Sequence, residues 1–279
     1  MRHYSIAELM AVTVSKELKS GDLGFIGIGS SGPAFIMAVA VPTVASRLAQ
    51  LQHAPDLHFM FGPVIDPLID GDLAPKSTAE YEYVNLLSNA QVPLEDTLNL
   101  FKLGKTTVGF ASGAQVDKYG NCNITVIGDH DRPKVRLVGT LAQTDIGAYS
   151  QRVIITAKHD RRVLVEKVDF ITCAGHLSGG SSRQEAGLPG GGPCMVVTDK
   201  AVLDFDDVTK EMKIRSLHPG VTLEEVVDNT GFDLKIPDEI PETVAPTDYE
   251  LDLIRNKIDP EGYWLKARLT GEEASLEKE

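Results

Sequence analysis

The sequence contains no apolar run that approaches the roughly 20 residues needed to cross a bilayer. Its first residues, Met-Arg-His-Tyr-Ser-Ile-Ala-Glu, also lack the basic segment and following apolar segment that mark a secretory leader. These absences predict a protein that works in the cytoplasm, with no membrane as partner.

Cysteine is scarce, since the 279 residues include only three: Cys122, Cys173 and Cys194. Their number is odd, they lie far apart, and none has a neighbour at the spacing of a zinc site. A disulfide framework and a metal knuckle are therefore not expected, and no metal is predicted. This cysteine usage is typical of a reducing compartment such as the cytoplasm.

Basic charge is also in short supply, because 27 Lys and Arg stand against 40 Asp and Glu and give a net charge of −13. No basic run interleaved with aromatic residues is present, so nucleic acid is not expected as a partner. An acidic balance does not exclude an anionic small molecule, since a binding groove can be lined locally or completed by another chain. The simplest role of the charge is solubility.

The sequence does contain an ordinary globular composition, with 42% hydrophobic and 24% charged residues. Apolar residues recur at helical spacing from Ile6 to Leu18, where Ser5 and Glu8 form the pattern of a capping box. No internal repeat or linker interrupts the chain, so we expect one α/β domain over residues 1–265 and a polar tail over 266–279. Further predicted elements are strands at 23–28, 57–61, 108–111, 123–127 and 194–198, helices at 34–52, 78–90, 94–104 and 222–229, and a hairpin over 203–214.

Residues 27–32, Gly-Ile-Gly-Ser-Ser-Gly, form a G-x-G-x-x-G pattern between a predicted strand and a predicted helix. A dinucleotide-binding fold requires an acidic residue at the end of the next strand, about 20 residues further on. Here the nearest acid, Asp56, precedes that strand, so the dinucleotide hypothesis fails. The turn around Gly29, Ser30 and Ser31 either binds a phosphate or carboxylate or only packs closely, and the sequence favours neither.

The most informative stretch is Gly-Ala-Gln-Val-Asp-Lys-Tyr-Gly-Asn-Cys-Asn at residues 113–123. Its small residues leave the end of a strand open, and Gln115 can donate an amide hydrogen bond there. Taken alone, this stretch predicts only a tightly packed hairpin. Together with other segments it resembles the B subunit of glutaconate CoA-transferase, a family I CoA-transferase. Those segments are Val-Ile-Gly-Asp at 126–129, Arg-Pro-Lys-Val-Arg at 132–136, Arg-Arg-Val-Leu-Val-Glu-Lys-Val-Asp-Phe at 161–170, Ser-Leu-His-Pro-Gly-Val-Thr at 216–222, Asn-Thr-Gly-Phe-Asp at 229–233 and Ile-Asp-Pro-Glu at 258–261.

The similarity runs in order over about residues 6–265, and it implies a fold, a partner and a ligand. The fold would be an open, mostly parallel α/β sheet with helices on both faces. The partner would be a homologous A subunit, and an acyl-CoA substrate would bind between the two chains. The resemblance implies no cofactor beyond the coenzyme A of the substrate. The expected CoA- and substrate-binding residues are Gly29, Ser30, Ser31, Gly113, Ala114, Gln115, Asn123, Ala142 and Gln143.

The nucleophile of the family is a glutamate that follows the second strand and carries CoA as a thioester. Its position falls here on Phe61 or Gly62, and neither can act as a nucleophile. Asp66 lies three or more residues away on a shorter side chain, so it would miss the same point by several ångströms. We predict instead that Asp66 or His58 transfers a proton or positions water, and that Gln115 donates a hydrogen bond at the reacting centre.

A second departure affects the turn whose N–H groups bind the thioester oxyanion, which is Gly-Ser-Gly-Gly-Ala in the family and Gly-Thr-Leu-Ala-Gln at residues 139–143 here. Backbone donors survive such a change, but Leu141 and Gln143 reshape the pocket. Two changes at the reacting centre favour altered chemistry: a hydrolase, a C–C-cleaving lyase or a decarboxylase that acts on an acyl-CoA. Two alternatives stay open, a true CoA-transferase and a structural B subunit whose partner carries all the chemistry.

Overall fold

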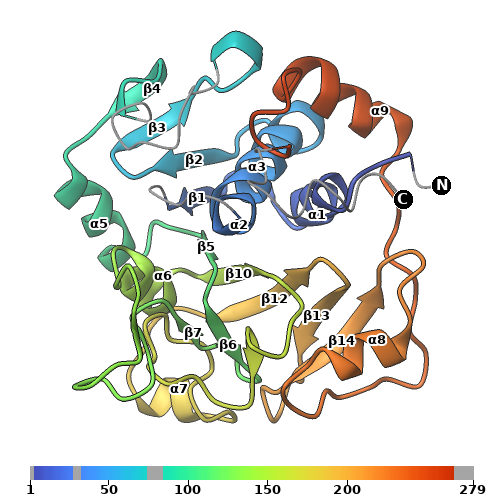
Figure 1. Cartoon of the computed structure of the whole chain (residues 1–279). Coiled ribbons are helices and arrows are strands. Elements are labelled where there is room, and N and C mark those ends of the chain that lie inside the picture. The colour runs from blue at the N-terminus through green and yellow to red at the C-terminus, as the bar shows by residue number, and fades with distance from the viewer. Residues whose placement is uncertain (1–2, 28–32, 74–83, 267–279) are drawn as a thin grey trace. The chain divides into compact units, whose positions relative to one another are not determined.

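A computed structural model describes residues 3–27, 33–73 and 84–266 (Figure 1). The chain divides into two compact units: unit 1 comprises Met1–Asp22, Ile26–Pro93 and Pro246–Glu279, and unit 2 comprises Leu23–Phe25 and Leu94–Ala245. The predicted binding residues Gly29, Ser30 and Ser31, and the tail from residue 267, lie outside the described residues. No helix in the described ranges is long and apolar enough to span a membrane.

The helices of unit 1 begin with α1 (Ile6–Ser15), which starts where the sequence predicts because Ser5 and Glu8 form a reciprocal capping box. Helix α1 packs against α3 (Val41–Gln52). The predicted helix over 34–52 is present, but its first part is a short turn, α2 (Pro33–Phe35), followed by a π-helix, η1 (Ile36–Ala40). Near the C-terminus, α9 (Asp248–Asp252) continues as a second π-helix, η3 (Leu253–Ile258).

The strands of unit 1 are β2 (His58–Phe61), β3 (Val64–Pro67) and β4 (Ser88–Gln91), which pair antiparallel in that order. A short 3₁₀-helix, η2 (Gly71–Leu73), follows β3. The predicted helix over 78–90 is wrong in its described part, because Ser88–Gln91 pairs with β3 as a strand. Backbone pairing across the sheet here outweighs a local helical pattern.

The main strands of unit 2 are parallel neighbours: β1 (Leu23–Ile26, of which Leu23–Phe25 belong to this unit), β5 (Val108–Ala111), β10 (Arg152–Ala157) and β12 (Pro193–Thr198). The predicted hairpin follows as β13 (Ala201–Phe205) and β14 (Met212–Leu217), antiparallel to its neighbours. Strands β5, β10 and β12 are buried along nearly their whole length. This pattern is typical of parallel strands that are covered on both faces. The predicted α/β class is therefore confirmed. The expectation of a mostly parallel sheet is not, because the parallel pairs β1–β5, β5–β10 and β10–β12 stand beside four antiparallel ones, β12–β13, β13–β14, β2–β3 and β3–β4, the first three of which form through short turns.

Three helices complete this part of unit 2. Helix α5 (Leu94–Lys102) contacts α6 (Gln143–Tyr149), and α6 contacts β5 (Figure 1). Helix α8 (Leu223–Asp228) begins at Thr222, the predicted N-cap, through a second reciprocal capping box.

A smaller sheet of unit 2 carries the stretch that the sequence singles out. Strand β6 (Gln115–Asp117) pairs antiparallel with β7 (Cys122–Asn123) and parallel with β11 (Leu164–Val165). Strands β8 (Val126–Ile127) and β9 (Val135–Arg136) form a separate hairpin. The predicted strand over 123–127 is thus split into β7 and β8. The chain turns between them, where the backbone amide of Thr125 donates a hydrogen bond to Asn123 Oδ1 at 2.9 Å. One further turn of helix, α7 (Ser182–Glu185), lies later in the unit.

Candidate functional site

The turn between β2 and β3 occupies the place that the resemblance assigns to a nucleophilic glutamate. Phe61, the last residue of β2, is fully buried and stacks on Trp264 with ring centroids 6.1 Å apart. Gly62 follows with a φ of +49°, a conformation that glycine adopts without strain. The chain therefore presents a core aromatic residue and a glycine turn at this point, with no carboxylate.

His58 and Asp66, the two residues predicted as alternatives for proton transfer or water positioning, lie next to each other. His58 Nδ1 lies 2.5 Å from Asp66 Oδ2, which also accepts Asn89 Nδ2 at 3.2 Å. Asp66 Oδ1 accepts the backbone amide of Phe59 at 3.0 Å. Asp66 is buried with both oxygens engaged, whereas the His58 side chain is 57% exposed.

A pocket of about 230 Å³ opens beside this pair. Arg47 forms one wall, and its guanidinium binds Asp70 bidentately, with Nε–Oδ1 and Nη2–Oδ2 distances of 2.8 and 2.6 Å. The pocket is lined by Arg47, Gln50, Pro55, Leu57, His58, Asp66, Pro67, Leu68 and Asn89.

The register of the hairpin places this pair away from the turn. Met60 pairs with Ile65 and Phe61 with Val64, so His58 and Asp66 lie at the opposite end of β2 and β3 from Gly62. At a rise of about 3.3 Å per residue, the Cα atoms of His58 and Phe61 are separated by roughly 10 Å along the strand. His58 and Asp66 therefore form a site of their own within unit 1, and their assignment as catalytic residues stays a prediction.

Gln115 lies at the start of β6 in unit 2, where its buried side chain is part of a hydrogen-bonded chain of amides. Asn123 Nδ2 donates to Gln115 Oε1 at 2.7 Å, and Gln115 Nε2 donates to Asp169 Oδ2 at 3.1 Å. Gly113 approaches the backbone so closely that a Cβ there would lie 2.6 Å from Gln115 O, which explains the glycine. Ala114 donates its amide to Asn123 O at 2.9 Å. The structure therefore brings together four of the predicted binding residues: Gly113, Ala114, Gln115 and Asn123.

Asp169 is the member of this cluster that the sequence reasoning missed. It lies 54 positions from Gln115 in the sequence and reaches it because β6 and β11 pair in parallel. The signal in the sequence was the segment 161–170, which carries the resemblance but offers no local pattern of a site.

The turn between β6 and β7, next to this cluster, is cross-linked by hydrogen bonds to Asp117. Asp117 accepts Asn121 Nδ2 at 2.9 Å and the amide of Tyr119 at 3.0 Å. Burial raises the pKa of Asp117, although the hydrogen bonds from Asn121 and Tyr119 oppose that shift. The side chain thus serves the turn and is not exposed to a ligand.

The loop 139–143 of unit 2 combines left-handed backbone with an exposed apolar side chain. Gly139 has a φ of +93°, and Leu141 has a φ of +44° although leucine disfavours that region. The Leu141 side chain is 67% exposed, so burial does not compensate for the strain. Ala142 is the N-cap position of α6, and Gln143 Nε2 donates to Ser112 O at 3.0 Å. Gln143 Oε1 is buried and contacts no donor within the described part of the chain.

The two cysteines of unit 2 that face each other are structural. Cys122 and Cys173 form an isolated antiparallel bridge through reciprocal backbone hydrogen bonds of 3.0 Å. A hydrogen bond to Cys173, together with burial, raises the pKa of the Cys122 thiol well above its usual value. A thiol held in its protonated form is a poor nucleophile. No group of three or more His, Cys, Asp or Glu side chains in residues 3–27, 33–73 and 84–266 is arranged to hold a metal ion.

The family profile described as Coenzyme A transferase matches residues 7–229. The chain belongs to the coenzyme A transferase family. The match spans the hairpin at Gly62, the Gln115 cluster and the loop 139–143, and it confirms the resemblance seen in the sequence.

Individual relatives are similar over between 78% and 95% of this chain. The B subunit of the 3-oxoadipate CoA-transferase of Pseudomonas knackmussii is 36% identical over 91% of this chain and 94% of that protein. A chain in the crystal structure of glutaconate coenzyme A-transferase from Acidaminococcus fermentans has a TM-score of 0.81 and 32% identity, and the match covers 95% of this chain and 98% of that one. The cholesterol ring-cleaving hydrolase IpdB subunit of Mycobacterium tuberculosis is 30% identical over 78% of this chain and 84% of that protein. The chain is thus similar both to proteins named for transfer and to one named for hydrolysis.

Proposed function

We propose that this chain is the B-type subunit of a two-subunit coenzyme A transferase family enzyme that cleaves an acyl-CoA without forming a glutamyl–CoA thioester on this chain. The observation that carries the proposal is the β2–β3 turn, where Phe61 is buried against Trp264 and Gly62 has no side chain. Covalent transfer requires a nucleophilic carboxylate, and this turn, to which the resemblance assigns it, offers none. The reaction would be hydrolysis, C–C cleavage or decarboxylation.

The chemistry available to the chain is stabilisation of negative charge. Cleavage of a bond next to a thioester generates an oxyanion or an enolate on the thioester oxygen. Gln115 Nε2 and the backbone amides around Ala142 are the donors that would stabilise that charge. Donors that are already held in place lower the barrier because they need no reorganisation as the charge develops.

The relatives support a partner and a substrate class for this chain. They are named as single subunits of enzymes with more than one chain, so we propose a homologous A-type subunit as partner. Coenzyme A appears in the names of the transferases, which favours an acyl-CoA as substrate. The hydrolase relative favours cleavage, and its 30% identity extends over 78% of this chain.

A true CoA-transferase is the second candidate, because the 3-oxoadipate CoA-transferase relative is similar over a larger share of the chain, at 36% identity. For that reaction the covalent carboxylate would have to come from elsewhere than the β2–β3 turn.

Steady-state kinetics of the co-purified two-subunit complex separates the two candidates. A panel of acyl-CoA thioesters is tested with and without an acceptor carboxylic acid, and free CoA, released CO₂ and the acyl products are measured. The proposal predicts turnover without acceptor acid. Turnover that depends strictly on the acceptor acid would establish the transferase instead.

A further inference from the structure

The Gln115 amide has one possible orientation. Its Oε1 accepts two donors, Asn123 Nδ2 at 2.7 Å and the backbone amide of Asp169 at 3.0 Å. Its Nε2 faces Asp169 Oδ2 at 3.1 Å. Exchange of the two ends of the amide would place an NH₂ group against two donors and lose all three hydrogen bonds. A primary amide has two N–H bonds, and within the described residues Nε2 contacts one acceptor, which leaves the second N–H for a ligand.

The Asp169 carboxylate is fixed by more than Gln115. Asp169 Oδ2 also accepts the backbone amide of Gly128 at 2.8 Å, so one oxygen joins β6 to the turn that follows β8. Asp169 is exposed, and both of these hydrogen bonds to its carboxylate are accepted by Oδ2. This carboxylate is therefore oriented by two N–H donors that come from different segments of unit 2.

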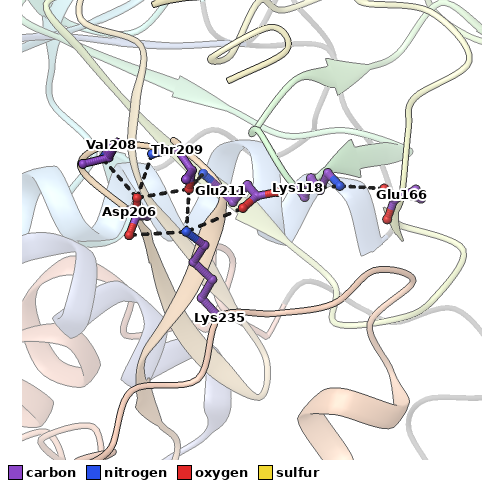
Figure 2. Close-up of polar contacts among 7 residues, drawn as sticks. All are labelled: Lys118, Glu166, Asp206, Val208, Thr209, Glu211 and Lys235. Atoms are coloured by element: carbon purple, nitrogen blue, oxygen red, sulfur yellow. Dashed lines mark hydrogen bonds and ion pairs between the residues drawn. The ribbon is translucent and has the colours of Figure 1, made fainter. Parts of the chain in front are cut away.

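The segment that carries Asp169 is anchored on both sides. Before it, Lys118 Nζ binds Glu166 Oε1 at 2.7 Å, and Figure 2 shows this ion pair at one end of a chain of polar contacts that reaches Lys235. After it, Phe170 stacks on His130 with ring centroids 5.2 Å apart. Each exposed ion pair is worth at most about 1 kcal/mol, but anchors on both sides restrict how far Asp169 can move.

We propose that Asp169 is a positioning residue that fixes the Gln115 amide so that its second N–H points at the thioester oxygen of the acyl-CoA, and this inference rests on the proposed function. An amide held by a carboxylate keeps its N–H in one direction before the substrate binds. Without the Asp169 carboxylate, Nε2 loses its acceptor and the amide is held at Oε1 alone, by Asn123 and the backbone amide of residue 169, so the direction of its N–H groups is less firmly fixed. A displacement of about 1 Å at such a donor costs on the order of 10² in rate.

The test compares Asp169→Ala, Asp169→Asn, Gln115→Ala and the Gln115→Ala/Asp169→Ala double variant in the co-purified complex. We expect Asp169→Ala to lower kcat on the order of 10² and to leave KM within a few-fold, as for a lost interaction made in the transition state. Asp169→Asn keeps an oxygen that accepts Gln115 Nε2 and the Gly128 amide, so it should retain kcat within about tenfold of wild type. The double variant should be no worse than Gln115→Ala alone, because the two residues act as a unit.

Asp238→Ala is the matched control, since Asp238 is an exposed aspartate elsewhere in unit 2, and its kinetics should equal those of wild type. The inference is overturned if Asp169→Ala keeps kcat within about threefold, or if the losses of the two single variants multiply. It is also overturned if Asp169→Asn is as inactive as Asp169→Ala, because the charge and not the position of the amide would then matter.

A double-mutant cycle of urea unfolding on the same variants measures the Gln115–Asp169 contact without reference to catalysis. If Gln115 and Asp169 are coupled in unfolding but turnover requires an acceptor acid, the proposed reaction class is wrong and the Gln115–Asp169 contact still stands. Absence of coupling in unfolding would defeat the positioning role whatever the reaction. Failure of the inference and failure of the proposed function are thereby distinguished.

Discussion

Two buried histidines in unit 2 make the protein sensitive to mild acid. His159 is buried, with Nδ1 2.8 Å from Thr198 Oγ1 and Nε2 3.1 Å from Val226 O. Burial lowers the pKa of His159 to about 4, against the partial opposition of the Val226 carbonyl. Burial likewise lowers the pKa of His176 to about 4.

The sign of the effect follows from which state binds more protons. The folded protein holds both imidazoles neutral, whereas the unfolded chain protonates them near pH 6.5. Their contribution to stability is therefore fully present above pH 6.5 and is lost as the pH falls toward 4. One such histidine lowers the free energy of unfolding by about 2 kcal/mol at pH 5, and by about 3 kcal/mol below pH 4.

Urea unfolding of wild type and His159→Gln at pH 7.5, 6.5, 5.5 and 5.0 measures this effect. Glutamine does not titrate, so the variant should be less stable than wild type at pH 7.5 but should lose about 2 kcal/mol less on going to pH 5. His130→Gln is the control, because His130 is exposed, and it should show the pH dependence of wild type. If His159→Gln kept the full pH dependence of wild type, the reasoning from burial would be refuted.

Three further substitutions test the packing and the strain directly. Trp264→Ala should lower the free energy of unfolding by about 3–5 kcal/mol, because this buried indole stacks on Phe35 and Phe61, and a loss below about 1 kcal/mol in urea unfolding would contradict that role. Leu141→Gly should leave the protein within about 1 kcal/mol of wild-type stability, since glycine relieves the strain at φ +44° and little buried surface is lost; a clearly lowered Tm would be inconsistent with this. Arg183→Met should cost about 3 kcal/mol or more by the same unfolding assay, because the buried guanidinium donates to backbone carbonyls of helix α6 (residue 147) and of two loops (residues 175 and 190) at 2.6, 2.9 and 2.8 Å. A stable variant would show that other groups can satisfy these carbonyls.

Local patterns predicted the elements whose cause is local. Ser5 and Thr222 each form a capping box with a glutamate three residues on, so α1 and α8 begin where the sequence places them. The antiparallel hairpin β13–β14 likewise follows from two apolar runs around an Asp-rich turn. Strand β4 could not be predicted in this way, because its residues form a strand through pairing with β3.

The candidate site shows the same limit. Gln115 could be singled out from its own segment, but Asp169 could not, because only the parallel pairing of β6 with β11 brings the two together. His58 and Asp66 were predicted as alternatives for one role, and the hydrogen bond between them could not be read from the sequence because it depends on the pairing of β2 with β3. The separation of Asp66 from the glutamate position was expected from the sequence, whereas that of His58 depends on the register of the β2–β3 hairpin.

The central claim is that catalysis proceeds without a covalent CoA adduct on this chain, and intact-mass analysis tests it most directly. The two-subunit complex is incubated with acyl-CoA in the absence of acceptor acid and is then quenched. The intact mass of each chain is measured before and after borohydride reduction. This chain should keep its unmodified mass while acyl-CoA is consumed. A CoA thioester that maps to Asp66, or to any other carboxylate of this chain, would contradict it.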